Sequence, residues 1–404
     1  MKVYMDNGAT TRVLPEVVRA MLPYFGEKYG NASSLHYMGL EAEEALEKGR
    51  RTIAKCINAE PEEIVFTGCA TEANNLAIVG ACEAKRGAKN KIITTKIEHS
   101  SVGNVFKRMQ NKGFEAVFLD VDGEGFVDAG QVARAIDDNT ILVSVIHANH
   151  EIGTIQDIAA IGRVCRQKGV LFHTDACQSF TKVPIDVKKQ NVDLLTLNAH
   201  KIHGPKGVGA LFVRRGVKLG KQIFGGPQEA NLRAGTENIA GIVGFAKAAE
   251  IGVRGMKKEA PRVTRLRDLL IAELLKMPNT RLNGPAGRNI GRRLCNNANV
   301  TFDFIEGEAL LMRLSARGIC VSTGSACSSK SLQPSHVLKA LGLRHEQAHG
   351  SIRFSLSKFN TAGEARYVVK EVKKEVAELR KISAFKPGDE KKAYYEERKE
   401  VLEE

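Results

Sequence analysis

Short apolar runs alternate with amphipathic stretches over roughly the first 255 residues of the chain. In residues 12–25 and 40–57, apolar positions recur three and four apart, which predicts two helices. Nearly continuous apolar runs predict strands buried on both faces, at residues 92–95, 116–119, 141–146, 170–173, 194–197 and 208–213. Strands that alternate with helices indicate an α/β layer with a mostly parallel sheet. Ligands of such sheets bind where strands end and helices begin.

The pattern changes after about residue 256. A helix is predicted at residues 263–276, ending near Pro278, and strands are predicted at residues 299–302, 318–322 and 352–356. A later helix places apolar residues on one face, at Ala365, Val368, Val369, Val372, Val376 and Leu379. The last residues, from Lys386, are charged and nearly free of aliphatic side chains, which predicts a solvated or partly disordered helix. This second region therefore indicates a smaller α+β domain.

The composition is that of a soluble globular protein. The 404 residues are 43% hydrophobic and 26% charged, without tryptophan. Residues 1–10 lack the apolar stretch of a signal peptide, and no run of about eighteen apolar residues could span a bilayer. We therefore expect a cytoplasmic protein without a membrane partner.

The charge balance is basic, with 60 Lys and Arg against 46 Asp and Glu and a net charge of +14. Acidic residues are interspersed among the basic ones, as in residues 370–375, and no nucleic-acid motif is present. We expect a solvated basic surface that suits an acidic protein partner, and no direct nucleic-acid binding.

The eight cysteines form no C-x-x-C pair and no cluster with zinc-ligand spacing; they are Cys56, Cys69, Cys82, Cys165, Cys177, Cys295, Cys320 and Cys327. We therefore expect reduced thiols and no metal site. Cys327 lies in the run Ser-Thr-Gly-Ser-Ala-Cys-Ser-Ser-Lys of residues 322–330, where small and polar residues predict a mobile loop with an exposed thiol. The other seven cysteines lie in predicted helices and strands, and we interpret them as packing residues.

Lys201 follows the predicted strand at residues 194–197 and precedes a turn rich in Gly and Pro. Burial at a strand end lowers the pKa of a lysine, and only a neutral amine adds to an aldehyde. A surface turn would place a lysine there equally well. Asp175 follows the strand at residues 170–173, and a carboxylate there suits the ring nitrogen of pyridoxal phosphate (PLP) or, alternatively, a helix cap.

Residues 67–75 carry small residues at the start of a helix, after the apolar Ile64 to Phe66. Free backbone N–H groups at such a start favour a phosphate, although ordinary capping also explains them. His99, after the strand that ends at Thr95, could stack on a flat ring or serve a structural role.

Together these segments resemble the cysteine desulfurases of the NifS/IscS family, which are fold-type-I PLP enzymes related to aminotransferases. The resemblance runs from residues 5–11 to about Ser383. It implies a large PLP-binding domain with a mostly parallel sheet at residues 13–256 and a smaller α+β domain from residues 1–12 plus 257–385. A charged tail follows at residues 386–404.

The resemblance implies a role for each matching residue. Lys201 looks like the lysine that holds PLP, and His99 like the residue that stacks on its ring and transfers protons. Asp175 would pair with the ring nitrogen and Gln178 with the phenolate oxygen. The phosphate contacts are implied to be Thr71, His200 and, from the neighbouring subunit of a homodimer, Thr236, and Ala70 and Asn198 are implied to bind the cofactor.

The substrate residues are implied in the same way. Arg353 matches the arginine that binds the carboxylate of L-cysteine, a task suited to a guanidinium. Lys201 or His99 would move the α-proton. Cys327 would then take the substrate sulfur as a persulfide, leaving alanine, and pass it to an iron–sulfur scaffold or a sulfur-relay protein. With a scaffold, Cys327 is also expected to ligate a cluster transiently.

His150 departs from the family, which usually has an asparagine there in contact with cofactor and substrate carboxylate. If His150 charges near neutrality, it would bind the carboxylate more tightly at low pH. Asn198 and Ala199 replace the usual Ser-Gly, and Gly68 and Cys69 replace another Ser-Gly. The alternatives are a selenocysteine lyase or other PLP β-eliminase, which needs no mobile Cys327, and a weakly active binding partner that keeps the fold.

Overall fold

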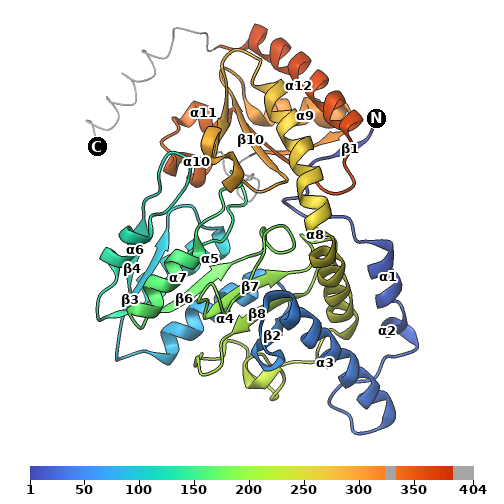
Figure 1. The fold of residues 1–404 in the computed structure, drawn as a ribbon, viewed down its shortest axis with the longest axis vertical. Coiled ribbons are helices and arrows are strands. Elements are labelled where there is room, and N and C mark those ends of the chain that lie inside the picture. The colour runs from blue at the N-terminus through green and yellow to red at the C-terminus, as the bar shows by residue number, and fades with distance from the viewer. Residues whose placement is uncertain (324–333, 385–404) are drawn as a thin grey trace.

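The computed structural model describes residues 1–323 and 334–384. The described residues form three sheets with helices packed around them. The larger two lie in the lower and the upper half of Figure 1, and the third has only two short strands. Cys327 and the predicted tail at residues 386–404 lie outside the described residues.

The larger sheet has seven strands, in the order β2 (Ile64–Thr67), β8 (Gly209–Val213), β7 (Leu194–Asn198), β6 (Leu171–Asp175), β5 (Thr140–Ser144), β3 (Lys91–Thr95) and β4 (Glu115–Leu119). Every neighbouring pair from β7 to β4 is parallel, and β8 alone runs antiparallel to its neighbours. β2, β5, β7 and β8 are buried along their whole length, as their continuous apolar sequences require. The predicted α/β fold with a mostly parallel sheet is confirmed.

Helices cover this sheet: α3 (Tyr37–Ile57), α4 (Ala70–Ala84), α5 (Ser100–Asn111), α6 (Ala129–Ala135) and α7 (Ile158–Gln167). The single helix predicted at residues 12–25 is wrong. The structure has α1 (Pro15–Met21) and α2 (Pro23–Gly26), with Pro23 opening the second helix at its first position. The helix predicted from residue 40 begins at Tyr37, because the His36 ring accepts a hydrogen bond from the Gly39 N–H at 3.3 Å.

α8 (Ile239–Leu274) is 36 residues long and runs from one sheet region to the other (Figure 1). The sequence predicted only its second part, at residues 263–276. Glycines in the first half lower helix propensity, and Pro261 lies inside the helix, so the local sequence hides its continuity. The predicted domain boundary at residue 256 falls within α8, and the division into two domains stays a prediction.

The smaller sheet is antiparallel, in the order β12 (Ser322–Thr323), β13 (Ser351–Ser355), β10 (Asn297–Phe302) and β9 (Thr280–Asn283). The strand predicted at residues 318–322 is two short strands in different sheets, because β11 (Ile319–Cys320) pairs instead with β1 (Val3–Tyr4). The six apolar residues predicted on one helix face are all buried on α12 (Ala362–Ile382). The remaining helices are α9 (Gly307–Ala316), α10 (His336–Ala340), α11 (His345–His349) and the 3-10 turns η1 (Pro61–Glu63), η2 (Glu229–Asn231) and η3 (Gly287–Arg292).

The first fourteen residues join the smaller sheet to the turn that carries Lys201. Asp6 forms a bridge with Ser355 of β13, and the Thr11 N–H donates to the His200 carbonyl at 2.9 Å. The Leu14 N–H donates to the His203 carbonyl at 3.1 Å. The N-terminal segment therefore fixes one side of the Lys201 turn.

Two further predictions from the sequence concern membrane-spanning segments and the cysteines. Within the described residues, no helix is both long and apolar enough to cross a membrane. Cys82, Cys165 and Cys177 are buried, as packing residues should be, but Cys69 and Cys320 are exposed. The packing interpretation is wrong for these two because Cys69 caps α4 from outside and Cys320 lies on a two-residue strand.

Candidate active site

Four predicted residues follow the carboxyl ends of four adjacent parallel strands. Lys201 follows β7, Asp175 ends β6, His150 follows β5 and His99 follows β3. In a parallel sheet such ends lie at one edge, so the order of the strands brings these side chains together. Their electrostatic interactions confirm the proximity, because both Lys201 and Asp175 affect the pKa of His99.

Asp175 is an anion held in a buried position. Its Oδ2 accepts a hydrogen bond from Asn74 Nδ2 at 2.8 Å and its Oδ1 accepts one from the Cys177 N–H at 2.9 Å. Burial raises the pKa of Asp175. The Asn74 hydrogen bond, nearby His99 and the Cys177 hydrogen bonds together lower this pKa by more than burial raises it, so the net pKa lies below its usual value. The carboxylate therefore stays charged at neutral pH.

A chain of hydrogen bonds links Asp175 to His99. The Asn74 amide also donates to Ser101 Oγ at 2.8 Å, and Ser101 Oγ lies 2.8 Å from His99 Nδ1. The Ser101 N–H donates to the same Nδ1 at 3.1 Å. Nδ1 is thus an acceptor, which assigns the proton of the neutral ring to Nε2. Burial, followed by the charge of Lys201, lowers the pKa of His99 to about 4, so the ring is neutral at physiological pH.

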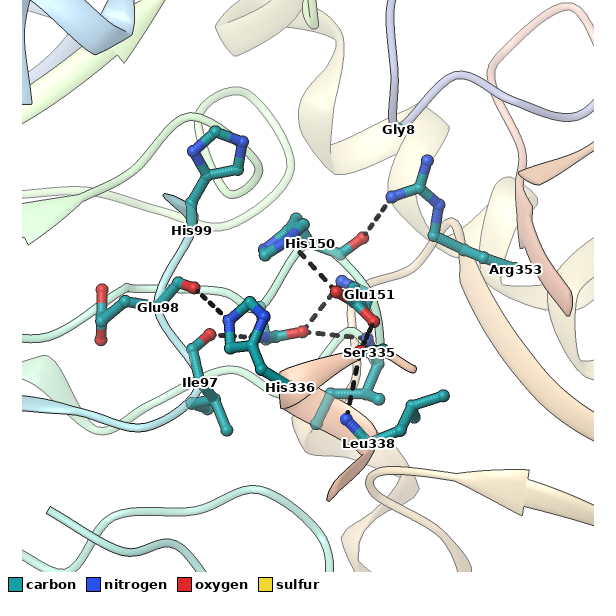
Figure 2. Close-up of polar contacts among 12 residues, drawn as sticks. Gly8, Ile97, Glu98, His99, His150, Glu151, Ser335, His336, Leu338 and Arg353 are labelled. Atoms are coloured by element: carbon teal, nitrogen blue, oxygen red, sulfur yellow. Dashed lines mark hydrogen bonds and ion pairs between the residues drawn. The ribbon is translucent and has the colours of Figure 1, made fainter. Parts of the chain in front are cut away.

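His150 lies beside His99, with ring centroids 5.0 Å apart and planes at 73° (Figure 2). Its Nε2 is 3.6 Å from Glu151 Oε1, and its Nδ1 is buried without a hydrogen-bond partner among the described residues. Burial, followed by His99, Lys201 and Arg353, lowers the pKa of His150 well below its usual value. This arrangement therefore disfavours a charge on His150 near neutrality, the condition for tighter carboxylate binding at low pH.

Glu151 connects this histidine to α10. Its Oε2 accepts a short hydrogen bond from Ser335 Oγ at 2.5 Å, and Ser335 also caps α10 by accepting from the Leu338 N–H at 3.2 Å (Figure 2). Next to Ser335, His336 Nε2 lies 2.9 Å from the Glu98 carbonyl oxygen. Burial raises the pKa of Glu151 to about 7, and Ser335 and Arg353 lower it less.

Arg353 on β13 faces His150 from the other side. Its Nη1 donates to the His150 carbonyl at 3.0 Å, and its Nη2 donates to Asp6 Oδ1 at 3.0 Å. The residue is 4% exposed, and its Nε has no hydrogen-bond partner in the described part of the chain. The guanidinium is thus fixed in place by two of its five N–H groups, and Nε–H is among the donors left over.

The residues around Lys201 are polar and mostly buried. Asn198 ends β7, and its Oδ1 has no hydrogen-bond partner among the described residues. His200 Nδ1 lies 3.2 Å from Thr10 Oγ1, and burial, then Lys201 and Lys206, lowers the pKa of His200 to about 4. Gln178 Nε2 donates to the Gly8 carbonyl at 2.9 Å. In this arrangement the Gln178 amide contacts the N-terminal segment.

Ala70 and Thr71 form the first turn of α4, as the phosphate interpretation requires. The cap residue Cys69 provides no side-chain hydrogen bond, so the first backbone N–H groups remain available for an anion. A Cβ added at Gly209 would lie 2.8 Å from the Cys69 carbonyl carbon, so β8 approaches this turn closely. Thr236 is exposed and lines a cavity of about 70 Å³ with Thr67 and Gly68. Its contact with a neighbouring subunit stays a prediction.

These features fit pyridoxal phosphate. A buried anion at Asp175 suits a protonated ring nitrogen, and the uncapped start of α4 suits the phosphate. Partnerless buried atoms at Asn198, His150 and Arg353 provide further polar contacts toward the same region. Among the described residues, no group of three or more His, Cys, Asp or Glu side chains could hold a metal ion.

Four residues of this site were not predicted from the sequence. Asn74 positions Asp175, Asp6 pairs with Arg353, and Glu151 and Ser335 lie beside His150. Asp6 and Asn74 lie inside segments already considered, at residues 5–11 and 67–75. No local signal assigns their partners, which are 347 and 101 residues away.

Comparison with known proteins identifies the family. The aminotransferase class-V family model matches residues 3–368. The chain belongs to this family. It is 48% identical over 387 residues to the cysteine desulfurase IscS of Methanosarcina thermophila, covering 96% of this chain and 95% of that one. It is 46% identical over 386 residues to the cysteine desulfurase IscS of Dictyoglomus turgidum, covering 95% and 97%.

Solved structures in the family share the architecture. A NifS-like protein, 39% identical, superposes with a TM-score of 0.88 and covers 94% of this chain and 100% of its own. The protein SspA, solved in complex with cysteine, is 36% identical with a TM-score of 0.78, covering 89% of this chain and 100% of its own. The fold-type-I assignment from the sequence is therefore confirmed.

Proposed function

We propose that this protein is a PLP-dependent cysteine desulfurase. It converts L-cysteine to L-alanine and holds the sulfur as a persulfide on Cys327. The observation that carries the proposal is the arrangement of Lys201, Asp175 and His99 at the ends of adjacent strands, in a chain 48% identical to a cysteine desulfurase. Relatives with this name support the reaction, and the site residues supply its chemistry.

The cofactor would be held from three directions. The Lys201 amine would bind its aldehyde, Asp175 would pair with its ring nitrogen, and the first turn of α4 with Ala70 and Thr71 would bind its phosphate, assisted by Asn198 and His200. PLP, when bound, withdraws electrons from the α-carbon of the amino acid attached to it. Asn74 keeps Asp175 charged and in place through its 2.8 Å hydrogen bond. Gln178, whose Nε2 donates to the Gly8 carbonyl, would contact the phenolate oxygen of the cofactor.

The substrate carboxylate would bind at Arg353. Asp6 and the His150 carbonyl orient the guanidinium, and Arg353 Nε is the buried donor left for an incoming anion. His150 would add one hydrogen bond through its neutral ring. His99, with its proton on Nε2, would donate toward the cofactor or the substrate, and Lys201 would accept the α-proton.

Cys327 would receive the sulfur. Its thiolate forms a bond to the substrate sulfur while the bond between that sulfur and the β-carbon breaks. The electron pair left on carbon takes up a proton, and alanine leaves. An acceptor protein then removes the persulfide sulfur, which serves iron–sulfur cluster assembly and tRNA thiolation. The net charge of +14 favours an acidic acceptor.

We further propose a cytoplasmic homodimer in which Thr236 contacts the phosphate of the neighbouring site. The exposure of Thr236 within a single chain supports this contact. Sedimentation or light scattering of the purified protein measures the oligomeric state, and a monomer at micromolar concentration contradicts it.

The decisive experiment measures alanine and persulfide from the purified protein with L-cysteine. We expect equimolar alanine and protein-bound sulfur, with the sulfur on Cys327. Cys327→Ser should abolish persulfide formation while keeping the visible absorbance of the bound cofactor. Lys201→Ala should abolish turnover, and borohydride should then fix no cofactor to the protein.

Each alternative gives another result. A selenocysteine lyase or other β-eliminase would release sulfide or selenium without a Cys327 persulfide, so Cys327→Ser would retain the wild-type rate. A binding partner without activity would form no alanine. A borohydride adduct on a lysine other than Lys201 would contradict the assignment of the cofactor lysine.

A further inference from the structure

A second cavity, of about 410 Å³, lies beside the turn that carries Lys201. α8 forms one wall, from Ala248 to Val263, and residues 295–296 and 356–358 form the other. His99, His150, Asp175 and Arg353 do not line it. Lys201 is the residue that this cavity shares with the site proposed for cofactor and substrate, so the cavity adjoins that site. Its volume is typical of small-molecule sites.

The charges that line this cavity are mostly positive. Five cationic side chains line it, Lys182, Lys201, Arg254, Lys258 and Lys358, against the single carboxylate Glu259. Glu259 is already paired with Arg262 at 3.0 Å. None of the five cations forms an ion pair within residues 1–323 and 334–384. With Lys201 bound to the cofactor, four cations remain, of which Arg254 interacts electrostatically with Glu250, and Lys358 with Glu16 and Glu259.

Among these cations, Lys182 is held by two hydrogen bonds to backbone carbonyl groups. Its Nζ donates to the Gln178 carbonyl at 3.0 Å and to the Lys201 carbonyl at 3.4 Å. An ammonium group has three N–H donors, so one remains after these two contacts. Burial lowers the pKa of Lys182 to about 8, and the group is still mostly charged at pH 7.

Apolar side chains also line the cavity, among them Leu14, Ile251, Met256, Val263 and Leu356, together with uncharged polar residues such as Thr11 and Asn296. Such a surface binds a hydrocarbon group by removing it from water. A cavity that combines this surface with unpaired cations suits a ligand with an anionic head and an apolar body.

We propose that this cavity binds a small organic anion, with the carboxylate or phosphate of the ligand on Lys182 and its apolar body between Ile251 and Leu356. Lys358, which is half-buried at the cavity wall, adds a second positive charge. The ligand contacts the ammonium that also holds the Lys201 carbonyl, and thus lies against the back of the cofactor turn.

The test measures binding by isothermal titration calorimetry on the full-length protein with its cofactor. The probes are hexanoate and hexyl phosphate, with hexan-1-ol and inorganic phosphate as the uncharged and the chain-free controls. We expect saturable binding of hexanoate or hexyl phosphate with a Kd below about 1 mM, and much weaker binding of both controls. Wild-type protein that binds neither amphiphilic anion overturns the proposal. Because turnover is not measured, this result is independent of the desulfurase proposal.

Variants locate the binding. Lys182→Met should weaken binding at least about tenfold, because a hydrogen bond to a charged group is lost. Lys189→Met is the matched control, since this lysine is 84% exposed and lies outside the cavity, and it should bind as wild type does. Arg353→Gln should also bind normally. Loss of binding in Arg353→Gln with retention in Lys182→Met would place the anion at the substrate site instead and overturn the proposal.

If Lys182→Met disturbs the Lys201 turn, a substitution that fills the cavity provides an independent test of binding. Ile251→Trp should block the hexyl group while leaving Lys182 and its two carbonyl contacts in place. Binding at wild-type affinity in both Ile251→Trp and Lys358→Met contradicts the proposed cavity, and loss in both supports it.

Discussion

His150 and Glu151 form a buried pair in which burial favours the neutral form of each side chain. The pKa of His150 lies well below its usual value, and burial raises the pKa of Glu151 to about 7. Between pH 6 and 8, the charge of Glu151 changes and that of His150 does not. The groups that face the pair are His99, Lys201, Arg353 and His336, and Ser335 holds the carboxyl.

This pair predicts how the affinity for cysteine depends on pH. Glu151 is neutral below pH 7 and gains a negative charge as the pH rises through that value. The new charge interacts with Arg353 and repels the substrate carboxylate. We therefore expect the KM for cysteine to rise roughly three- to tenfold from pH 6 to pH 8, and this rise to be absent in Glu151→Gln.

The variant His150→Asn distinguishes the contribution of His150 to the KM from that of Glu151. It should change the KM at every pH, because the hydrogen bond to the substrate changes, but it should keep the pH-dependent rise that Glu151 causes. Steady-state kinetics of the three proteins from pH 6 to 9 measure this. A flat profile in His150→Asn with an unchanged rise in Glu151→Gln would show that the histidine titrates after all.

Among the residues of the site, those that follow strand ends could be predicted from the sequence, but their hydrogen-bonding partners could not. Lys201, Asp175 and His99 each follow a buried apolar run, which is a local signal. The contacts of Arg353 with Asp6 and of Ser335 with Glu151 join positions 347 and 184 residues apart. Such pairs depend on tertiary packing, which no local pattern encodes.

Two helices, α3 and α8, cross at a glycine. A Cβ at Gly49 of α3 would lie 2.7 Å from Cγ2 of Ile242, which is 1% exposed on α8. We expect Gly49→Ala to destabilise the protein by about 1 kcal/mol or more, since overpacking outweighs the gain in helix propensity. The midpoint of urea unfolding measures this.

Gly103 on α5 is the matched control. A Cβ there would meet nothing within 4 Å. Gly103→Ala should therefore stabilise the protein by about 0.5–1 kcal/mol through helix propensity alone. Equal effects of the two substitutions would contradict a close crossing of α3 and α8.

The prediction of elements succeeded where hydrophobic periodicity was strong. The face of α12 from Ala365 to Leu379 and six of the seven strands of the large sheet were predicted close to their observed positions, β2 being the exception. α8 was found only in part, because its first half contains helix-weakening glycines and its interior contains Pro261. Packing on both sides overrides these local preferences.

α8 belongs to two hydrophobic cores. Ile242 and Phe245 pack in the core of the large sheet, and Leu270 and Leu274 pack in the core of the small one. Because one continuous helix packs in both cores, a substitution that destabilises one core should also destabilise the other. This also explains why the change in hydrophobic pattern after residue 256 marks no break in the helix.

Leu270→Ala tests the connection. Leu270 is fully buried, so its truncation should cost about 2–5 kcal/mol. We expect hydrogen exchange to become faster at Val300 in the small core and also at Val143 in the large one. Faster exchange at Val300 alone would show that the two cores open independently.

The N-terminal segment has a consequence for synthesis on the ribosome. Its Asp6 must find Ser355 of β13 and Arg353 beside it, which the ribosome adds about 350 residues later. At about 5–20 residues per second, that delay is roughly 18–70 s. The large sheet can be complete well before then, since its last strand, β8, ends at Val213. A nascent chain therefore carries an assembled sheet but an unfinished carboxylate site until Asp6 meets β13.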